Sequence, residues 1–257
     1  VRLSLPRLHW CGSAPRRTAR SYSRDVAGRP IHTFEVLRTQ RLTPHMIRVV
    51  FGGNGFDTFT PKEFTDSYVK FAIVPAGVEV AGLAQPLTLD SFEELPADQR
   101  PTVRTYTVRS VDTEQRELTV DFVVHGDTGV AGPWAATLAP GDPAYLMGPN
   151  GAYSTNPAAD WHLLAGDEAG LPALSTALEA LPPNAIGQAF IEVDGPDDEL
   201  DLTAPAGVTI HWIHRGGRAD LVPDDQAGDN APLIAAVRAA DWLPGQVQVF
   251  VHGEAQT

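Results

Sequence analysis

The sequence predicts a six-stranded antiparallel Greek-key barrel followed by a doubly wound parallel α/β domain. Two observations support this combined β and α/β fold class. Six short strand-like segments with turn residues between them fit within about 120 residues, which is typical of a small barrel. After residue 156 strand-like segments alternate with helical ones, the pattern of a parallel sheet. We therefore predict a barrel domain at 29–155 and an α/β domain at 156–257.

Alternating apolar and polar residues mark the barrel strands. A Thr-Pro turn separates two strands within 31–53, and four more are expected at 66–74, 102–112, 117–126 and 145–154. The second and third of these four, at 102–112 and 117–126, follow each other with a short turn between them, so these two should pair like a hairpin. Residues 76–101 are rich in proline and acidic side chains, which predicts a long surface excursion.

The α/β domain is predicted from a strand beginning at Trp161 and a helix with leucines at helical spacing. These leucines are Leu171, Leu174, Leu178 and Leu181. Further strands are expected at 187–195, 207–217 and 245–255, with a second helix at 231–243. The sequence ends directly after the last strand, so we expect the helix and tail that would follow it to be absent from this sequence.

The composition indicates a folded protein, with 43% hydrophobic and 20% charged residues. No apolar run approaches membrane-spanning length, so no membrane insertion is expected. The single cysteine, Cys11, excludes an internal disulfide and a cysteine metal cluster. A reducing, cytoplasmic setting is the natural expectation.

The charge is unevenly distributed along the chain. Residues 1–30 hold seven arginines and one acid, so the other 227 residues carry 12 basic and 31 acidic side chains. An acidic body repels nucleic acid and anionic membranes, and no nucleic-acid partner is expected. Residues 1–28 lack apolar periodicity and are predicted to form a disordered basic arm. A transit peptide or an upstream-extended start remain open explanations for this arm.

One strand carries an unusual set of polar and aromatic side chains. The tetrad Arg104-Thr105-Tyr106-Thr107 resembles the flavin motif of the ferredoxin–NADP reductase superfamily. The resemblance implies that the arginine holds a pyrophosphate, the tyrosine packs on the isoalloxazine ring and a hydroxyl reaches the N5 region. A guanidinium fork suits phosphate, and a tyrosine ring offers a flat amphipathic surface. The alternative, that Tyr106 is an ordinary core residue of the barrel, remains open.

A second segment points to an anion site. Residues 122–142 follow a strand that ends at His125, and small residues there precede a short helix near Gly132-Pro133-Trp134. Proline in the first helical turn leaves backbone N–H groups available to an anion. Together with Arg104, this favours the dinucleotide FAD over a mononucleotide flavin. The cofactor-binding residues predicted from this segment are His125, Gly129, Ala131, Gly132 and Trp134.

Several stretches together resemble the siderophore-interacting proteins, which are FAD-containing ferric-siderophore reductases. These stretches are HTFEVLRTQRLTPHMIRVVFGG, FTDSYVKF, RTYTVR, FVVHGDTGVAGPWA, GPNGAY, WHLLAGDEAGLPAL and VFVHGEA, in that order, from about Arg29 to Ala255. The resemblance implies a flavin-binding barrel, a pyridine-nucleotide-type domain and reduction of chelated iron. It also implies that Asp167 and Glu168 contact the cofactor.

Two departures from these patterns affect the predicted site. Gly132 stands where the wider flavin superfamily usually has Ser or Thr, so backbone donors must replace a hydroxyl there. Ala169 replaces a threonine in the family's GDETALPA loop, which here reads GDEAGLPA. A contact near the flavin or nicotinamide is therefore in question.

Two basic residues are predicted to bind the substrate. The resemblance associates Lys70 with the substrate pocket, and Arg109 follows the flavin tetrad on the face of Thr107. An acidic body needs such local positive charge to admit an anionic chelate. A solvated strand end paired with Asp66 is the alternative for Lys70. The eight histidines show no ligand spacing, so no metal site is predicted.

We therefore predict FAD-dependent reduction of a ferric siderophore, which releases Fe(II) for iron acquisition. No side chain beyond the flavin is predicted to be catalytic. The expected donor is NAD(P)H or ferredoxin, and the expected state is a monomer. Two alternatives remain: a flavin- or ferredoxin-type reductase with another acceptor, and a non-enzymatic flavin-containing protein that binds the chelate.

Overall fold

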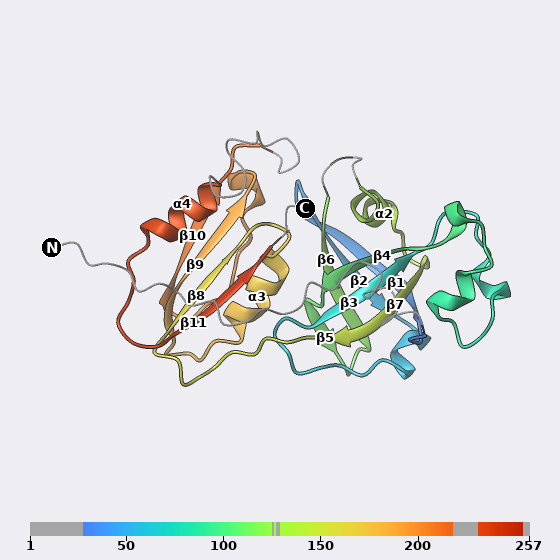
Figure 1. The fold of residues 1–257 in the computed structure, drawn as a ribbon, viewed down its shortest axis with the longest axis horizontal. Coiled ribbons are helices and arrows are strands. Elements are labelled where there is room, and N and C mark those ends of the chain that lie inside the picture. Colours follow the sequence, from blue (N-terminus) through green and yellow to red (C-terminus); the bar gives the residue numbers. More distant parts are fainter. Residues whose placement is uncertain (1–27, 125, 127–128, 218–230, 254–257) are drawn as a thin grey trace.

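The structure is a computed structural model that describes residues 28–124, 126, 129–217 and 231–253. The described residues form two sheets, a seven-stranded antiparallel one and a four-stranded parallel one, which lie side by side (Figure 1). The predicted disordered arm falls almost entirely outside the described residues. None of the described helices is long and apolar enough to cross a membrane.

The antiparallel sheet is built from seven strands in the order β4-β3-β7-β1-β2-β6-β5. Their bounds are β1 His32–Thr43, β2 Met46–Gly52, β3 Tyr68–Ile73, β4 Thr102–Thr107, β5 Ser110–Asp112, β6 Glu117–Val123 and β7 Pro143–Asn150. All pairings between these strands are antiparallel. The predicted segments are all strands, and β5 and β6 pair as expected.

The predicted count of six strands is wrong, because the segment at 102–112 is divided into two. β4 pairs with β3, and β5 pairs with β6 on the other side of the sheet. The break falls at Val108 and Arg109, whose amides donate to Ser67 O at 2.7 Å and Thr119 O at 2.9 Å. The chain thus changes partner at this point and links the two edges of the sheet. The alternation of apolar and polar residues continues through this bend, so the sequence pattern gives no indication that the chain changes partner.

The antiparallel sheet corresponds to the predicted barrel domain and keeps that name below, while its Greek-key closure stays a prediction. Its inner face is filled by alternate residues of the strands, as a half-buried antiparallel sheet requires. Aromatic side chains dominate it, and Phe34, Phe51, Phe71 and Phe122 are each at most 1% exposed. The excursion at 76–101 contains three short 3-10 helices, η2 Val80–Gly82, η3 Leu89–Phe92 and η4 Ala97–Gln99. It packs Leu87 and Phe92 against the outer face of the barrel, on Ala72 and Met147.

The parallel sheet has the strand order β10-β9-β8-β11 and a helix on each face. The strands are β8 Trp161–Gly166, β9 Ile186–Val193, β10 Gly207–His214 and β11 Val247–His252. The helices are α3 Leu171–Glu179 and α4 Pro232–Ala239. Leu164 on β8 packs with α3, whereas its neighbours Leu163 and Ala165 pack with α4. Both faces of β8 are therefore buried, which explains its largely apolar sequence.

The strand order reverses between β8 and β11, which makes this the switch point of the sheet. In open α/β sheets, ligands bind at such a point, outside the carboxyl ends of the strands. Helix α3, drawn in yellow-gold, lies on the side of the sheet that faces the barrel (Figure 1). The switch point is therefore turned toward the barrel domain.

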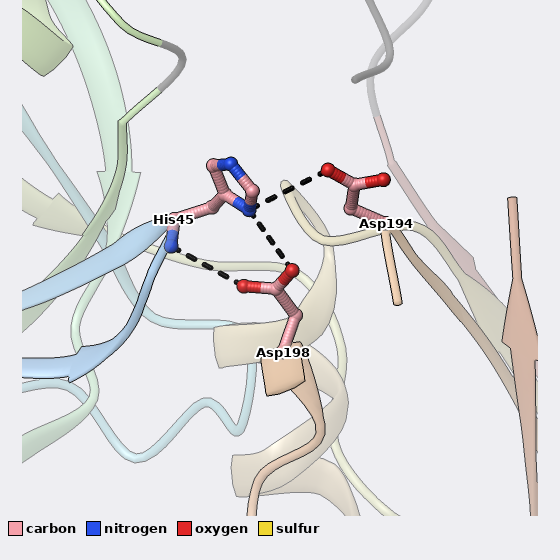
Figure 2. A group of neighbouring side chains, drawn as sticks. All are labelled: His45, Asp194 and Asp198. Carbon is pink, nitrogen blue, oxygen red and sulfur yellow. Dashed lines mark hydrogen bonds and ion pairs between the residues drawn. The ribbon is translucent and has the colours of Figure 1, made fainter. Parts of the chain in front are cut away.

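Among the described residues, polar contacts join the barrel domain to the α/β domain at three places, besides the hydrogen bond from Gln248 Nε2 to Ser154 O at the domain boundary. Arg109 pairs with Glu179 at the end of α3, and the Thr176 hydroxyl donates to Thr65 O at 2.6 Å. The third contact is shown in Figure 2, where His45 meets Asp198. The backbone nitrogen of His45 lies 3.2 Å from Oδ1 of Asp198, and Nδ1 of the His45 ring lies 2.9 Å from Oδ2 of Asp198.

Candidate functional site

A cleft of ≈ 390 Å³ lies between the two domains. This volume is in the range of small-molecule sites. The barrel contributes Tyr68, Arg104, Thr105, Tyr106, Thr107, Asp121, Val123, Gly129, Val130, Ala131 and Gly132, and the α/β domain contributes Ala169, Pro172, His252 and Gly253. The second group surrounds the carboxyl ends of β8 and β11. The cleft is thus bounded by the predicted flavin tetrad on one wall and by the switch point on the other.

The whole tetrad on β4 lines this cleft. Arg104 and Thr105 are exposed, and the guanidinium Nη1 of Arg104 donates to the Val103 carbonyl at 3.0 Å. Thr107 is only 8% exposed and faces Tyr68 across the β3–β4 pair. Since all four residues line the cleft, a ligand bound there would contact β4.

Tyr106 belongs to the barrel core and also lines the cleft, and its contact with a flavin stays a prediction. Its ring packs against Phe122 with centroids 4.4 Å apart, and against Phe71 at 6.1 Å. These contacts join it to the barrel core. Tyr106 is nevertheless only partly buried and lines the cleft. A ring fixed on one side by the core can offer its remaining surface to a flat ligand.

The glycine-rich segment also reaches the cleft. Gly129, Ala131 and Gly132 line it, at the start of α2 Ala131–Thr137. Trp134 packs instead against Phe71 and Phe122 and lines a separate, smaller cavity. His125, which was predicted to bind the cofactor, lies outside the described residues.

Asp167 and Glu168 are not among the described residues that line the cleft. Oδ1 of Asp167 accepts the Gly170 amide at 3.0 Å. Nη2 of Arg215 donates to both carboxylate oxygens of Glu168 at 3.0 Å, and Nη1 of the same arginine donates to Oε1 of Glu192 at 3.2 Å. The side chains of this triad are 5–8% exposed. The two carboxylates raise the pKa of Arg215 against the opposing effect of its burial. Their predicted contact with a cofactor stays a prediction.

Lys70 and Arg109, the two predicted substrate residues, also lie outside the set that lines the cleft. Lys70 is 6% exposed, and its ammonium donates to the Thr105 hydroxyl at 2.9 Å. Arg109 is bound to Glu179 of α3. Asp66, considered above as a partner of Lys70, accepts the amides of Ala152 and Tyr153 at 2.8 Å. The structure does not bring the two basic residues together, and their substrate role stays a prediction.

The sequence analysis missed Tyr68, Asp121 and His252 as cleft residues. For Asp121 the sequence does contain an indication, because a carboxylate within the apolar run LTVDFVV needs a partner when the strand is buried. That partner is Arg48, directly opposite on β2, whose Nε and Nη2 each lie 2.7 Å from a carboxylate oxygen. Asp121 raises the pKa of Arg48 through these hydrogen bonds, against the opposing effect of burial.

His252 is the last residue of β11, at the switch point. Its Nδ1 is buried and has no hydrogen-bond partner among the described residues. Gly166 and Gly170 lie against its carbonyl oxygen, since a Cβ on either would come within 2.0 Å of that atom. Glycine at these two positions thus permits the close packing of β8, β11 and the loop before α3 beside the cleft.

The contact in Figure 2 was not visible in the sequence, because its members are distant in the chain. One ligand atom each of His45, Asp194 and Asp198 lies within 4.8 Å of the others, a spacing that could hold a metal ion. The hydrogen bonds from His45 to Asp198 already account for the arrangement, with Asp194 3.7 Å from the ring. We describe it as an interdomain contact.

Comparison with known proteins decides the family. Residues 35–153 match the siderophore-interacting FAD-binding domain, and residues 159–257 match the siderophore-interacting protein domain. The chain belongs to the siderophore-interacting protein family. The sequence resemblance is thereby confirmed, and residues 35–153 are the FAD-binding domain of this family member.

Relatives in the family include proteins with and without a described activity. An uncharacterised protein of Mycobacterium tuberculosis is 65% identical over 90% of this chain and 82% of its own. The ferric vibriobactin reductase ViuB of Vibrio cholerae is 32% identical over 70% of this chain and 65% of its own. The NADPH-dependent ferric-chelate reductase of Escherichia coli is 31% identical over 83% of this chain and 81% of its own.

A solved structure has the same two-domain fold. The siderophore utilization protein of T. fusca superposes with a TM-score of 0.71 at 34% identity, covering 88% of this chain and 82% of its own.

The cleft fits the FAD that the family implies. Arg104 offers an exposed guanidinium to a pyrophosphate, and Tyr106 offers a supported aromatic surface. Gly129 has a φ of +76°, and a Cβ there would meet no atom within 4 Å. The space beside this turn is therefore open to a ligand, on the same wall as the tetrad.

Proposed function

We propose that this protein is an FAD-dependent oxidoreductase that reduces ferric siderophores and thereby releases Fe(II). The observation that carries the proposal is the interdomain cleft, in which the Arg104–Thr107 tetrad faces the switch point of the α/β sheet. Membership of the siderophore-interacting protein family supports it. So do the relatives that are named as ferric vibriobactin reductase and ferric-chelate reductase.

Electron counting explains why such a reaction uses a flavin. A nicotinamide donates a hydride, which carries two electrons, whereas each ferric ion accepts one. When bound, FAD supplies the conversion between the two. The protein has to hold this cofactor and bring the chelate close to its exposed edge. Siderophores bind Fe(III) through hard oxygen ligands, and the lower charge of Fe(II) weakens those bonds, so reduction favours release.

The residues of the barrel wall would hold the cofactor. Arg104 binds the pyrophosphate through charge-assisted hydrogen bonds. Tyr106 supports the flat ring system, because its own ring is fixed against Phe122. The hydroxyl of Thr107, which is 8% exposed and lines the cleft, would donate a hydrogen bond to the ring. The turn at Gly129 allows the backbone to approach the ligand closely.

The residues of the opposite wall would receive the electron donor. Ala169 and Gly253 follow β8 and β11 at the switch point, where α/β sheets bind nucleotides. We propose NAD(P)H as the donor, and the NADPH dependence in the name of the Escherichia coli relative supports this choice. Ala169 offers only a methyl group, so recognition of the donor rests on the backbone and on neighbouring residues.

The test measures Fe(II) formation. Purified protein is loaded with FAD and mixed anaerobically with NADPH or NADH and a ferric siderophore, and Fe(II) is followed with a ferrous-specific chelator. We expect Fe(II) only when protein, FAD, donor and ferric siderophore are all present. Turnover of ferredoxin or other acceptors without the siderophore would favour a different reductase. Binding of the chelate without Fe(II) formation would favour a non-enzymatic binding protein.

A further inference from the structure

Arg109 makes a two-pronged contact across the domain interface. Its Nη1 and Nη2 donate to the two carboxylate oxygens of Glu179, at 2.9 and 2.5 Å. Arg109 lies on the barrel, between β4 and β5, and Glu179 is the last residue of α3. The arginine side chain is only 18% exposed, so the pair is partly shielded from water. Parallel hydrogen bonds of this type fix orientation as well as distance.

The same arginine is connected to the floor of the cleft. Its Nε lies 3.9 Å from Oδ2 of Asp121, which is buried and lines the cleft. Asp121 is held in turn by Arg48 through two hydrogen bonds of 2.7 Å. Four charged side chains of alternating sign therefore run from the barrel sheet to α3: Arg48, Asp121, Arg109 and Glu179. Such a network restrains its members more strongly than an isolated surface pair.

Helix α3 transmits this restraint to the opposite wall of the cleft. Pro172 in its first turn and Ala169 just before it line the cleft, whereas Glu179 is at its far end. A nine-residue helix is a rigid element of about 13 Å. In the middle of the helix, the Thr176 hydroxyl also donates to the barrel, at Thr65 O. Moving the Glu179 end would tilt the helix and displace the cleft residues at its other end.

We infer that Arg109 is a positioning residue, which holds α3 against the barrel and so sets the separation between the two walls of the cleft. It acts through Glu179 and Asp121, and it is not among the described residues that line the cleft. This positioning role adds to the proposed function. The predicted effect on reaction rate rests on the proposed function, whereas the predicted effect on the distance between the domains does not. Transfer between two bound groups is steeply sensitive to their separation, and a shift of about 1 Å can cost about 100-fold in rate.

The barrel provides a matched control pair. Arg38 and Glu117 form the same two-pronged contact, with both hydrogen bonds at 2.6 Å, but both residues belong to the barrel. Breaking this pair removes an ion pair of the same two-pronged geometry, on a more exposed arginine, without affecting the domain interface. Arg38→Gln is therefore the control for Arg109→Gln.

The first measurement is a distance between the domains, which does not depend on any reaction. Spin labels are placed on cysteines at Thr113, in the exposed turn after β5, and at Ala239, on α4, in a Cys11→Ser background. We expect Arg109→Gln and Glu179→Gln to broaden or shift the distance distribution, and Arg38→Gln to leave it unchanged. Unchanged distributions in both interface variants would overturn the inference, whatever the protein's reaction.

The second measurement separates positioning from folding and cofactor binding. We expect Arg109→Gln to keep its melting temperature within a few degrees of the parent and its FAD content intact, while flavin reduction by saturating NADPH slows about 10- to 100-fold. Arg109→Lys, which keeps the charge, should recover part of this rate. The Arg109→Gln/Glu179→Gln double variant should lose no more than either single one. Additive losses, or an equal loss in Arg38→Gln, would contradict the inference.

Discussion

The ammonium group of Lys70 donates a hydrogen bond to the hydroxyl of Thr105, with 2.9 Å between Nζ and Oγ1. The two residues face each other across the β3–β4 pair. Lys70 is buried, whereas Thr105 is exposed and lines the cleft. The positive charge thus lies one side chain behind the cleft wall. In this position it can act on a bound anion through its field, without direct contact.

Replacing Lys70 by methionine should therefore weaken the binding of an anionic ferric chelate more than that of a neutral one. A unit charge behind the wall should contribute about 1–2 kcal/mol at an effective dielectric constant of about 20. The measurement is the dissociation constant of both kinds of chelate in Lys70→Met and in the parent protein. Thr105→Val is the control, because it removes the hydrogen bond and keeps the charge. Equal weakening for both chelates would show that Lys70 has only a structural role.

Arg104 should decide whether the protein distinguishes FAD from FMN. If its guanidinium binds the pyrophosphate, Arg104→Gln should weaken FAD binding by about 1.5–3 kcal/mol, the range for hydrogen bonds to charged groups. FMN has no pyrophosphate, so its affinity should change much less. Titration of the apoprotein with each flavin, followed by fluorescence, measures both. Equal losses for FAD and FMN would mean that Arg104 acts elsewhere, and Arg38→Gln shows the effect of losing an arginine outside the cleft.

Gly170 should tolerate no side chain. A Cβ on this residue would lie 2.0 Å from the carbonyl oxygen of His252, a backbone atom that cannot simply rotate away. Gly170→Ala should lower the free energy of unfolding by about 1–3 kcal/mol, the usual cost of overpacking. Gly82→Ala is the control, because a Cβ there meets no atom within 4 Å. Denaturant unfolding of both variants is the measurement, and equal stabilities would contradict the packing described at the switch point.

His162 should make the protein less stable in mild acid. Burial lowers the pKa of this histidine below its ordinary value of 6.5, and a hydrogen bond that the ring donates to Gln248 offsets this only in part. The folded state then binds fewer protons than the unfolded state, so the free energy of unfolding falls as the pH drops below about 6.5. One such group contributes at most about 1.4 kcal/mol per pH unit. His162→Gln should flatten this part of the stability curve, and an unchanged slope would exclude His162 as a cause.

Much of the fold could be predicted from the sequence, because hydrophobic periodicity reports which faces of a strand or helix are buried. It gave the strand at 66–74, the helix after Gly170 and the order of elements in the α/β domain. It could not show that the chain changes partner at Val108 and Arg109. Both halves of that segment keep the same alternation, and only the hydrogen bonds to Ser67 and Thr119 reveal the bend.

The site was predictable on one wall only. The tetrad at 104–107 and the glycines at 129 and 132 are local motifs, and all of them line the cleft. The opposite wall and the interface depend on contacts between distant residues. Arg109 was predicted to bind the substrate from its charge and its place after the tetrad, whereas its pairing with Glu179, 70 positions away, could not be read from the sequence. Lys70 was predicted to lie in the substrate pocket; the structure shows it 6% exposed and bound to Thr105, and its substrate role stays a prediction.

The account rests on electron transfer from reduced flavin to siderophore-bound iron, and one anaerobic measurement tests this directly. The FAD-loaded protein is photoreduced, excess donor is removed, and a ferric siderophore is added in a stopped-flow spectrometer with a ferrous-specific chelator present. We predict that the absorbance of oxidised flavin returns and that two Fe(II) ions appear for each flavin, since the flavin releases two electrons and each ferric ion accepts one. Flavin that stays reduced in the presence of bound ferric siderophore, or that reoxidises without Fe(II), would contradict the account.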